Sequence, residues 1–60
     1  MTPDELDQVY AELSNALERV GPQKAQLMLA TLSLALLVEV KSSLVAREKI
    51  AQAERLAMAH

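Results

Sequence analysis

Through the first twenty residues of the chain, hydrophobic side chains recur at steps of three and four positions, the spacing that places them on one face of an α-helix. The residues of this apolar stripe are Leu6, Val9, Tyr10, Leu13, Ala16, Leu17 and Val20. A helix start signal precedes the stripe. Thr2 can act as N-cap, Pro3 suits the first helical position, and Glu5 can close a capping box with Thr2. The pattern predicts an amphipathic helix over residues 3–20.

Gly21 and Pro22 end this helix. Glycine accepts the left-handed conformation at a helix C-terminus, and proline cannot continue the hydrogen-bond ladder. Pro22 can in turn open the next helix at its first position. Because the connection is so short, we expect the first two helices to be antiparallel neighbours in a helical hairpin.

The central stretch, residues 27–38, contains no charged residue. We expect a second helix over residues 22–41, and its most apolar line is Ala25, Met28, Leu29, Leu32, Ala35 and Leu36. A helix that is hydrophobic all round has to be surrounded by other parts of the protein. Residues 32–41 also alternate in polarity as a β-strand does. Leu, Ala and Met dominate there and no second strand is available for pairing, which favours the helix.

Lys41, Ser42 and Ser43 form the only other plausible break in the pattern. Ser42 or Ser43 can cap a third helix over residues 43–58. The apolar stripe of this helix is thinner and consists of Val45, Ala46, Ile50, Ala53, Leu56 and Ala57. No Gly or Pro enforces the break, so a single continuous helix from Pro22 onward is the alternative.

The chain length makes association the expected source of stability. Sixty residues form one domain at most, and such a chain buries only roughly 60% of the surface that its unfolded form exposes. Small domains usually add disulfides, a metal or a partner chain. This chain has no Cys and a single His, which leaves no disulfide and no usual nitrogen and sulfur ligand set for a metal.

We therefore expect one all-α domain over residues 1–60, either a helical hairpin or a three-helix unit. Its apolar central helix is expected to assemble the chain into a homodimer, or a higher homo-oligomer, that resembles a four-helix bundle. The residues expected at the interface are Tyr10, Leu13, Leu17, Met28, Leu29, Leu32 and Leu36. The predicted function is that of a small helical protein–protein interaction module.

Charge argues against a nucleic-acid partner, because the net charge is -2 and the pI is about 5.2, whereas nucleic-acid binders usually carry a basic stripe. The bases of the last predicted helix are interrupted by Glu48 and Glu54. The distribution is uneven, since residues 1–18 carry five acids and no base. Opposite charges favour the first and last segments lying near one another, within one chain or across a dimer.

A membrane span is not expected, because the uncharged run over residues 25–38 has fourteen residues and spanning a bilayer takes about 20. The acidic N-terminus does not resemble a secretory signal, which needs a positive first region, so we expect a cytoplasmic protein.

Candidate chemistry is sparse. Asp7 and Tyr10 lie three positions apart, but Tyr10 belongs to the apolar stripe and Asp7 to the acidic first turns. The acids Asp4, Glu5 and Asp7 lack the spaced oxygens and the glycine of a calcium loop. One Gly in the whole chain leaves no glycine-rich phosphate loop. We expect no enzymatic activity, no catalytic residue, and no metal or cofactor site.

Two short motifs carry a resemblance to a known family. Asp7, Tyr10 and Leu13 form the pattern D-x-x-Y-x-x-L. The second motif, A-x-L-x-L-x-L, consists of Ala30, Leu32, Leu34 and Leu36, and Arg47 and Glu48 follow it. In these residues the chain resembles a family of short, uncharacterised bacterial helical proteins, a domain of unknown function, without gaps over most of its length. The family tends to have Arg at Thr31 and Gly-Asp in place of Lys41 and Ser42.

The resemblance implies no established activity. Members of the family look like small companions encoded with catabolic oxidoreductases. The resemblance therefore supports an alternative function, an accessory or chaperone-like small subunit that binds a larger partner protein, for which an oxidoreductase is one candidate.

Overall fold

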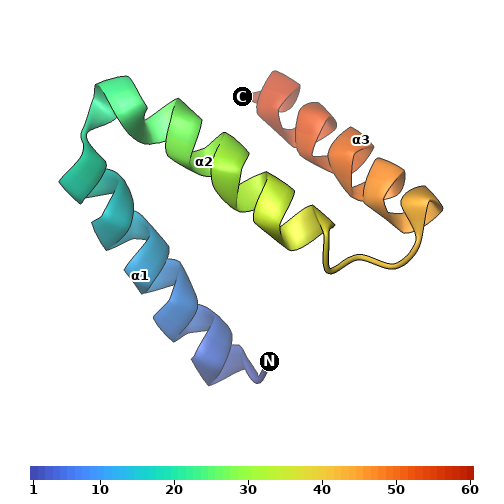
Figure 1. Ribbon diagram of the computed structural model, residues 1–60, viewed down its shortest axis with the longest axis horizontal. Helices are drawn as coiled ribbons and strands as arrows, with labels where there is room; N and C mark the ends of the chain where they lie inside the picture. The colour runs from blue at the N-terminus through green and yellow to red at the C-terminus, as the bar shows by residue number, and fades with distance from the viewer.

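The computed structural model describes residues 1–60 as three α-helices with no strand (Figure 1). They are α1 (Pro3–Val20), α2 (Pro22–Leu37) and α3 (Ser43–Ala59). The predicted all-α class and the division into three helices are confirmed. The strand interpretation of residues 32–41 and the single continuous helix from Pro22 are both wrong, because α2 is helical up to Leu37 and the chain leaves the helix before Ser43.

The start of α1 is a complete capping box. The Thr2 backbone N–H donates to the Glu5 carboxylate Oε1 at 2.8 Å, and the Glu5 backbone N–H donates to Thr2 Oγ1 at 3.1 Å. Two backbone donors that the helix itself cannot satisfy are thereby paired. The hydrogen bond from the Thr2 backbone, followed by that from the Thr2 side chain, lowers the pKa of Glu5 below its ordinary value of 4.5.

This lowered pKa predicts a pH dependence of stability. Because the pKa of Glu5 is lower in the folded chain than in the unfolded chain, its contribution is complete above 4.5 and is lost as the pH falls through the folded value. Urea unfolding of the Glu5→Gln variant is expected to depend less on pH between about 7 and about 3 than that of the wild type, since Gln keeps the reciprocal hydrogen bond without titrating. Glu12→Gln, which removes an acid outside the capping box, should retain the wild-type dependence. An identical pH dependence in Glu5→Gln and wild type contradicts the prediction.

The turn between α1 and α2 consists of Gly21 alone. Its backbone has φ 82° and ψ 164°, a combination that is essentially restricted to glycine. The Gly21 N–H donates to the Leu17 carbonyl oxygen at 3.1 Å, and the Gly21 carbonyl accepts from the Lys24 N–H at 3.2 Å. Gly21 therefore closes the end of α1 and opens α2 at the same time.

Substituting Gly21 by Ala tests the importance of this backbone conformation. An added Cβ meets no atom within 4 Å, so any cost comes from φ and ψ and not from a clash. We expect Gly21→Ala to lower the free energy of unfolding by about 1–3 kcal/mol in urea titrations. A synthetic chain with D-alanine at position 21, which favours positive φ, should be at least as stable as the wild type. Equal destabilisation by both alanines contradicts the prediction.

The expected antiparallel hairpin of the first two helices is wrong. From Gly21 the helices diverge as the arms of a V (Figure 1). Cα atoms of α1 and α2 lie within 8 Å of each other only between residues fewer than twelve positions apart, close to the turn. The reason is the length of the connection, since a helical hairpin needs a loop of about 2–5 residues to bring two helices side by side and one residue is too few.

The helical hairpin of this chain is formed by α2 and α3, which run side by side in opposite directions (Figure 1). α2 ends at Leu37 instead of near Lys41. The backbone hydrogen bonds that follow span three residues, as in a turn, instead of the four residues of an α-helix. Glu39 N–H donates to the Leu36 carbonyl at 3.0 Å, and Val40 N–H donates to the Leu37 carbonyl, also at 3.0 Å. Both are i to i+3 hydrogen bonds. Ser42 caps α3 through Oγ, which accepts from the Val45 N–H at 3.2 Å.

No residue of the single chain is buried. Its radius of gyration is 13.0 Å, whereas a compact domain of this length has about 10.4 Å. The helices are thus well defined by their own hydrogen bonds and caps, but they do not enclose a hydrophobic core.

Candidate interaction surface

The central helix α2 is apolar on three sides. The side toward α1 contains the half-buried residues Ala25, Met28 and Leu32. The side toward α3 contains Leu36 and Leu37. The remaining side carries Leu27 and Leu34, and each of these side chains is 67% exposed. Neither neighbouring helix of the same chain covers this last side.

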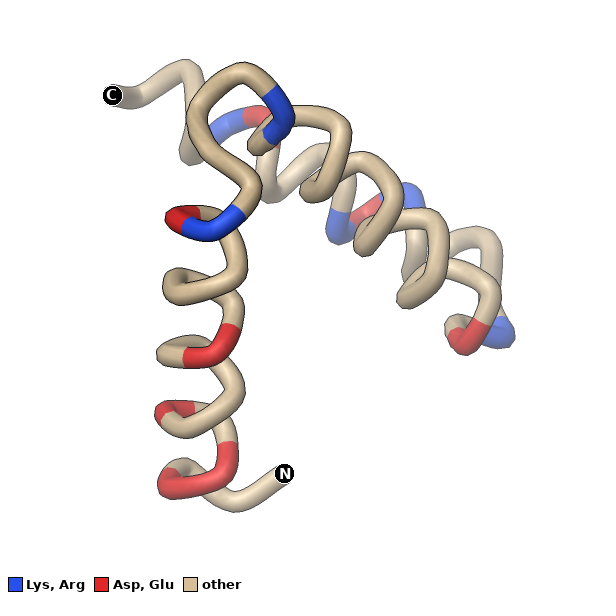
Figure 2. The backbone as a smooth tube through the Cα atoms, turned by 60° about the vertical axis from the view of Figure 1, so that its left-hand side comes forward, with Lys and Arg blue, Asp and Glu red and all other residues tan.

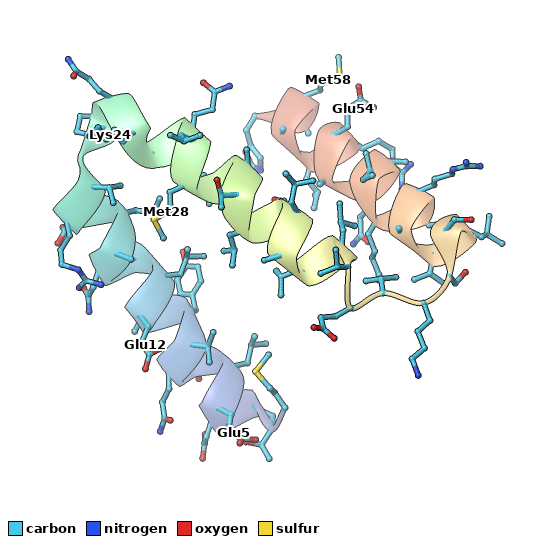
Figure 3. The ribbon with its side chains drawn as sticks, in the orientation of Figure 1. Glu5, Glu12, Lys24, Met28, Glu54 and Met58 are labelled. Carbon is cyan, nitrogen blue, oxygen red and sulfur yellow. The ribbon has the colours of Figure 1, made fainter.

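The structure divides the predicted interface residues into two groups. Leu13 and Leu17 of α1 and Met28 and Leu32 of α2 are half-buried. They mark the sides on which the two helices face each other near the turn, and Met28 lies in the angle between the helices (Figure 3). The other predicted residues are exposed, with 68% for Tyr10, 42% for Leu29 and 59% for Leu36.

The sequence does not predict a groove between α2 and α3, although one of its lining residues, Leu36, was expected at the interface. It has a volume of about 350 Å³ and is open along one side. Its apolar lining consists of Leu36, Leu37, Val40, Ala46, Ile50 and Ala53. The apolar stripe of the third helix was recognised in the sequence. The sequence pattern does not predict that α3 folds back beside α2, and this arrangement brings the apolar stripes of the two helices together in one groove.

The polar groups of the groove are few. Ser33 donates its hydroxyl to the carbonyl oxygen of Leu29 at 2.7 Å, within its own helix. This hydroxyl therefore needs no partner from another molecule, and an apolar side chain can pack against it without leaving a donor unpaired. Lys49 is the only charged residue that lines the groove.

Charge is separated along the chain (Figure 2). α1 carries Asp4, Glu5, Asp7, Glu12 and Glu18 against the single base Arg19. α2 carries only Lys24, near its start, and α3 carries three bases and two acids. Within one chain the acidic first turns of α1 lie far from α3 in both views (Figures 1 and 2), so the expected approach of the two charged segments is wrong for the isolated chain. Approach across a dimer stays a prediction.

Comparison with known proteins adds no assignment. Neither a family model, nor a curated protein, nor a solved structure matches this chain. The resemblance to short bacterial helical proteins therefore stays a prediction based on the two motifs.

Other kinds of site find little support in the geometry. No group of three or more His, Cys, Asp or Glu side chains comes together in a way that could hold a metal ion. No helix has both the length and the apolar character that crossing a bilayer requires. The distinctive feature of the molecule is its exposed apolar surface on α1 and α2 and in the groove between α2 and α3.

Proposed function

We propose that this chain is a small protein–protein interaction module that self-associates as a homodimer through the apolar surface of α2 and α1. The observation that carries the proposal is the complete lack of buried residues in a chain of which 52% is hydrophobic. Single exposed hydrophobic residues are normal on protein surfaces, but large contiguous apolar patches mark interaction sites.

The exposed area supports association quantitatively. The isolated chain exposes 5642 Å², whereas a compact monomer of 6.6 kDa exposes about 3,900 Å². The excess is about 1,700 Å² per chain. If two chains remove this excess from water, the interface totals about 3,400 Å², which lies within the range of about 2,000–5,000 Å² for obligate homodimers.

The residues that we assign to this interface are those predicted from the sequence, namely Tyr10, Leu13, Leu17, Met28, Leu29, Leu32 and Leu36. The half-buried members join α1 to α2 near the turn, and the exposed members, Tyr10, Leu29 and Leu36, continue this apolar surface outward. A bundle of helices from two chains would cover both groups.

An accessory subunit is the second candidate, because an exposed amphipathic helix can also bind in a groove of a larger protein. Sedimentation of the purified chain separates the two functions. A stable species of twice 6.6 kDa supports self-association. An aggregating or poorly folded chain that becomes soluble on co-expression with a protein encoded beside it supports the accessory subunit and contradicts self-association. A folded monomer contradicts self-association.

A further inference from the structure

We propose that the groove between α2 and α3 receives α1 of a second copy of this chain, so that the two chains exchange their first helices. This inference rests on the proposed self-association and assigns its geometry. It concerns the side of α2 that faces α3, together with the lining residues of α3; of all these residues, the sequence pattern placed only Leu36 at an interface.

The occupant has to come from outside the chain, because α1 of the same chain does not reach the groove. The single-residue turn at Gly21 directs α1 away from α3 (Figure 1). No residue of α1 has its Cα within 8 Å of any residue twelve or more positions away. The groove and the outer half of α1 are thus both left uncovered by the fold of one chain.

The first half of α1, in which Leu6, Val9 and Tyr10 are exposed and Leu13 is half-buried, has the spacing of a helix that binds in a groove. Leu6, Val9, Tyr10 and Leu13 occupy positions i, i+3, i+4 and i+7, the anchor pattern of amphipathic helices docked in hydrophobic grooves. At about 1.5 Å per residue, the 18 residues of α1 extend about 27 Å, and the 16 and 17 residues of α2 and α3 about 24 and 26 Å. The lining of the groove covers residues 33–40 and 46–53, and the anchors of α1 cover residues 6–13, so the guest segment and each lining segment have the same length.

Charge favours α1 over α2 as the guest helix. With 3.6 residues per turn, Glu5 and Glu12 flank the apolar stripe of α1 on one side and Asp7 flanks it on the other. Either orientation of α1 in the groove therefore presents a carboxylate to Lys49, the one charged lining residue. α2 of a second copy carries no acid at all and has no such complement.

A twofold-symmetric dimer is the smallest assembly in which every groove is filled. Each copy has one groove and one free α1, so two copies can satisfy each other reciprocally across a twofold axis, with no groove or stripe left over.

Tyr10 is the only aromatic residue of the chain and the largest exposed side chain of the α1 stripe, and tyrosine is enriched among the residues that dominate binding energy. We assign it as the anchor that packs against Ile50 in the groove of the partner copy.

The composition of the chain allows a direct test by NMR. Ile50 is the only isoleucine and Tyr10 the only aromatic residue. Chains that carry ¹³C-labelled isoleucine methyl groups and are otherwise deuterated are mixed with protonated, unlabelled chains, and the mixture is unfolded in urea and refolded. A nuclear Overhauser effect from the Tyr10 ring protons to the Ile50 methyl can then arise only between two chains. Tyr10→Leu, which keeps an apolar anchor, should remove the signal while the dimer persists.

We expect this cross-peak in a sample that sediments as a dimer. A dimer in which the Ile50 methyl shows no intermolecular contact with any proton of α1 overturns the exchange of first helices but leaves self-association intact. A monomer overturns both. If some other molecule fills the groove, the expected cross-peak is absent, and this result also overturns the exchange of first helices.

A charge reversal supplies an independent measurement. Lys49→Glu places a carboxylate beside the acids of the guest helix twice per dimer, so the dimer dissociation constant is expected to rise about tenfold at low salt, and by less at high salt. Arg55→Glu makes the same change on the same helix, on the side turned away from the groove, and should alter the dissociation constant much less. Equal effects of the two reversals contradict the assignment of α1 to the groove.

Discussion

Replacing Leu32 by Asp is expected to abolish assembly and to remove most of the helicity of the chain. Leu32 is half-buried on the side of α2 that faces α1, and the proposed dimer covers it further. An unpaired carboxylate in such a site costs about 3 kcal/mol or more. The whole stability of a folded chain of this length is about 3–9 kcal/mol, so one such substitution per chain removes a large part of it.

Far-UV circular dichroism and sedimentation of Leu32→Asp measure both parts of this result. Gln26→Asp is the matched control, because it introduces the same charge on the same helix at an exposed polar position. The control should remain helical and dimeric. A Leu32→Asp variant that is monomeric and fully helical contradicts the dependence of the fold on assembly.

Replacing Leu36 by Asp is expected to weaken the dimer by about a hundredfold to ten-thousandfold without unfolding the single chain directly. Leu36 is 59% exposed in the isolated chain and lines the groove. Covering a leucine is worth about 1.5–3 kcal/mol, and a symmetric dimer loses this contribution twice, which corresponds to that range of dissociation constants. If Leu36 faced water in the working protein, the change in stability would stay within about 0.5 kcal/mol.

Leu44→Asp is the control for Leu36→Asp. Leu44 is 65% exposed, a value close to that of Leu36, but it lies at the start of α3 and does not line the groove. The dimer dissociation constant, from sedimentation equilibrium, should be nearly unchanged in this variant. If the two aspartates weaken the dimer equally, the groove side of α2 is not part of the interface.

The three helices could be predicted from the sequence because the signals that begin and end a helix are local. The capping box of Thr2 and Glu5, the terminating Gly21 and the cap at Ser42 each act within a few residues, and the structure contains all of them. The periodicity of α1 likewise depends only on the spacing of its own side chains.

The arrangement of the helices could not be predicted in the same way. The V of α1 and α2 follows from the one-residue connection and from the backbone angles of Gly21, which residue spacing does not encode. The end of α2 at Leu37 is formed by two i to i+3 hydrogen bonds in a region where no Gly or Pro marks a break. The groove requires α3 to fold back beside α2 across residues 38–42, so Lys49 and Ile50 could not be recognised as lining residues from their own stripe.

A dilution series followed by circular dichroism at 222 nm and by sedimentation equilibrium tests the central claim most directly, because it measures whether folding and association are one process. Association-dependent folding predicts that helicity falls as dilution shifts the mass from twice 6.6 kDa toward 6.6 kDa. A monomer that stays fully helical and unassociated at high concentration in plain buffer would contradict it.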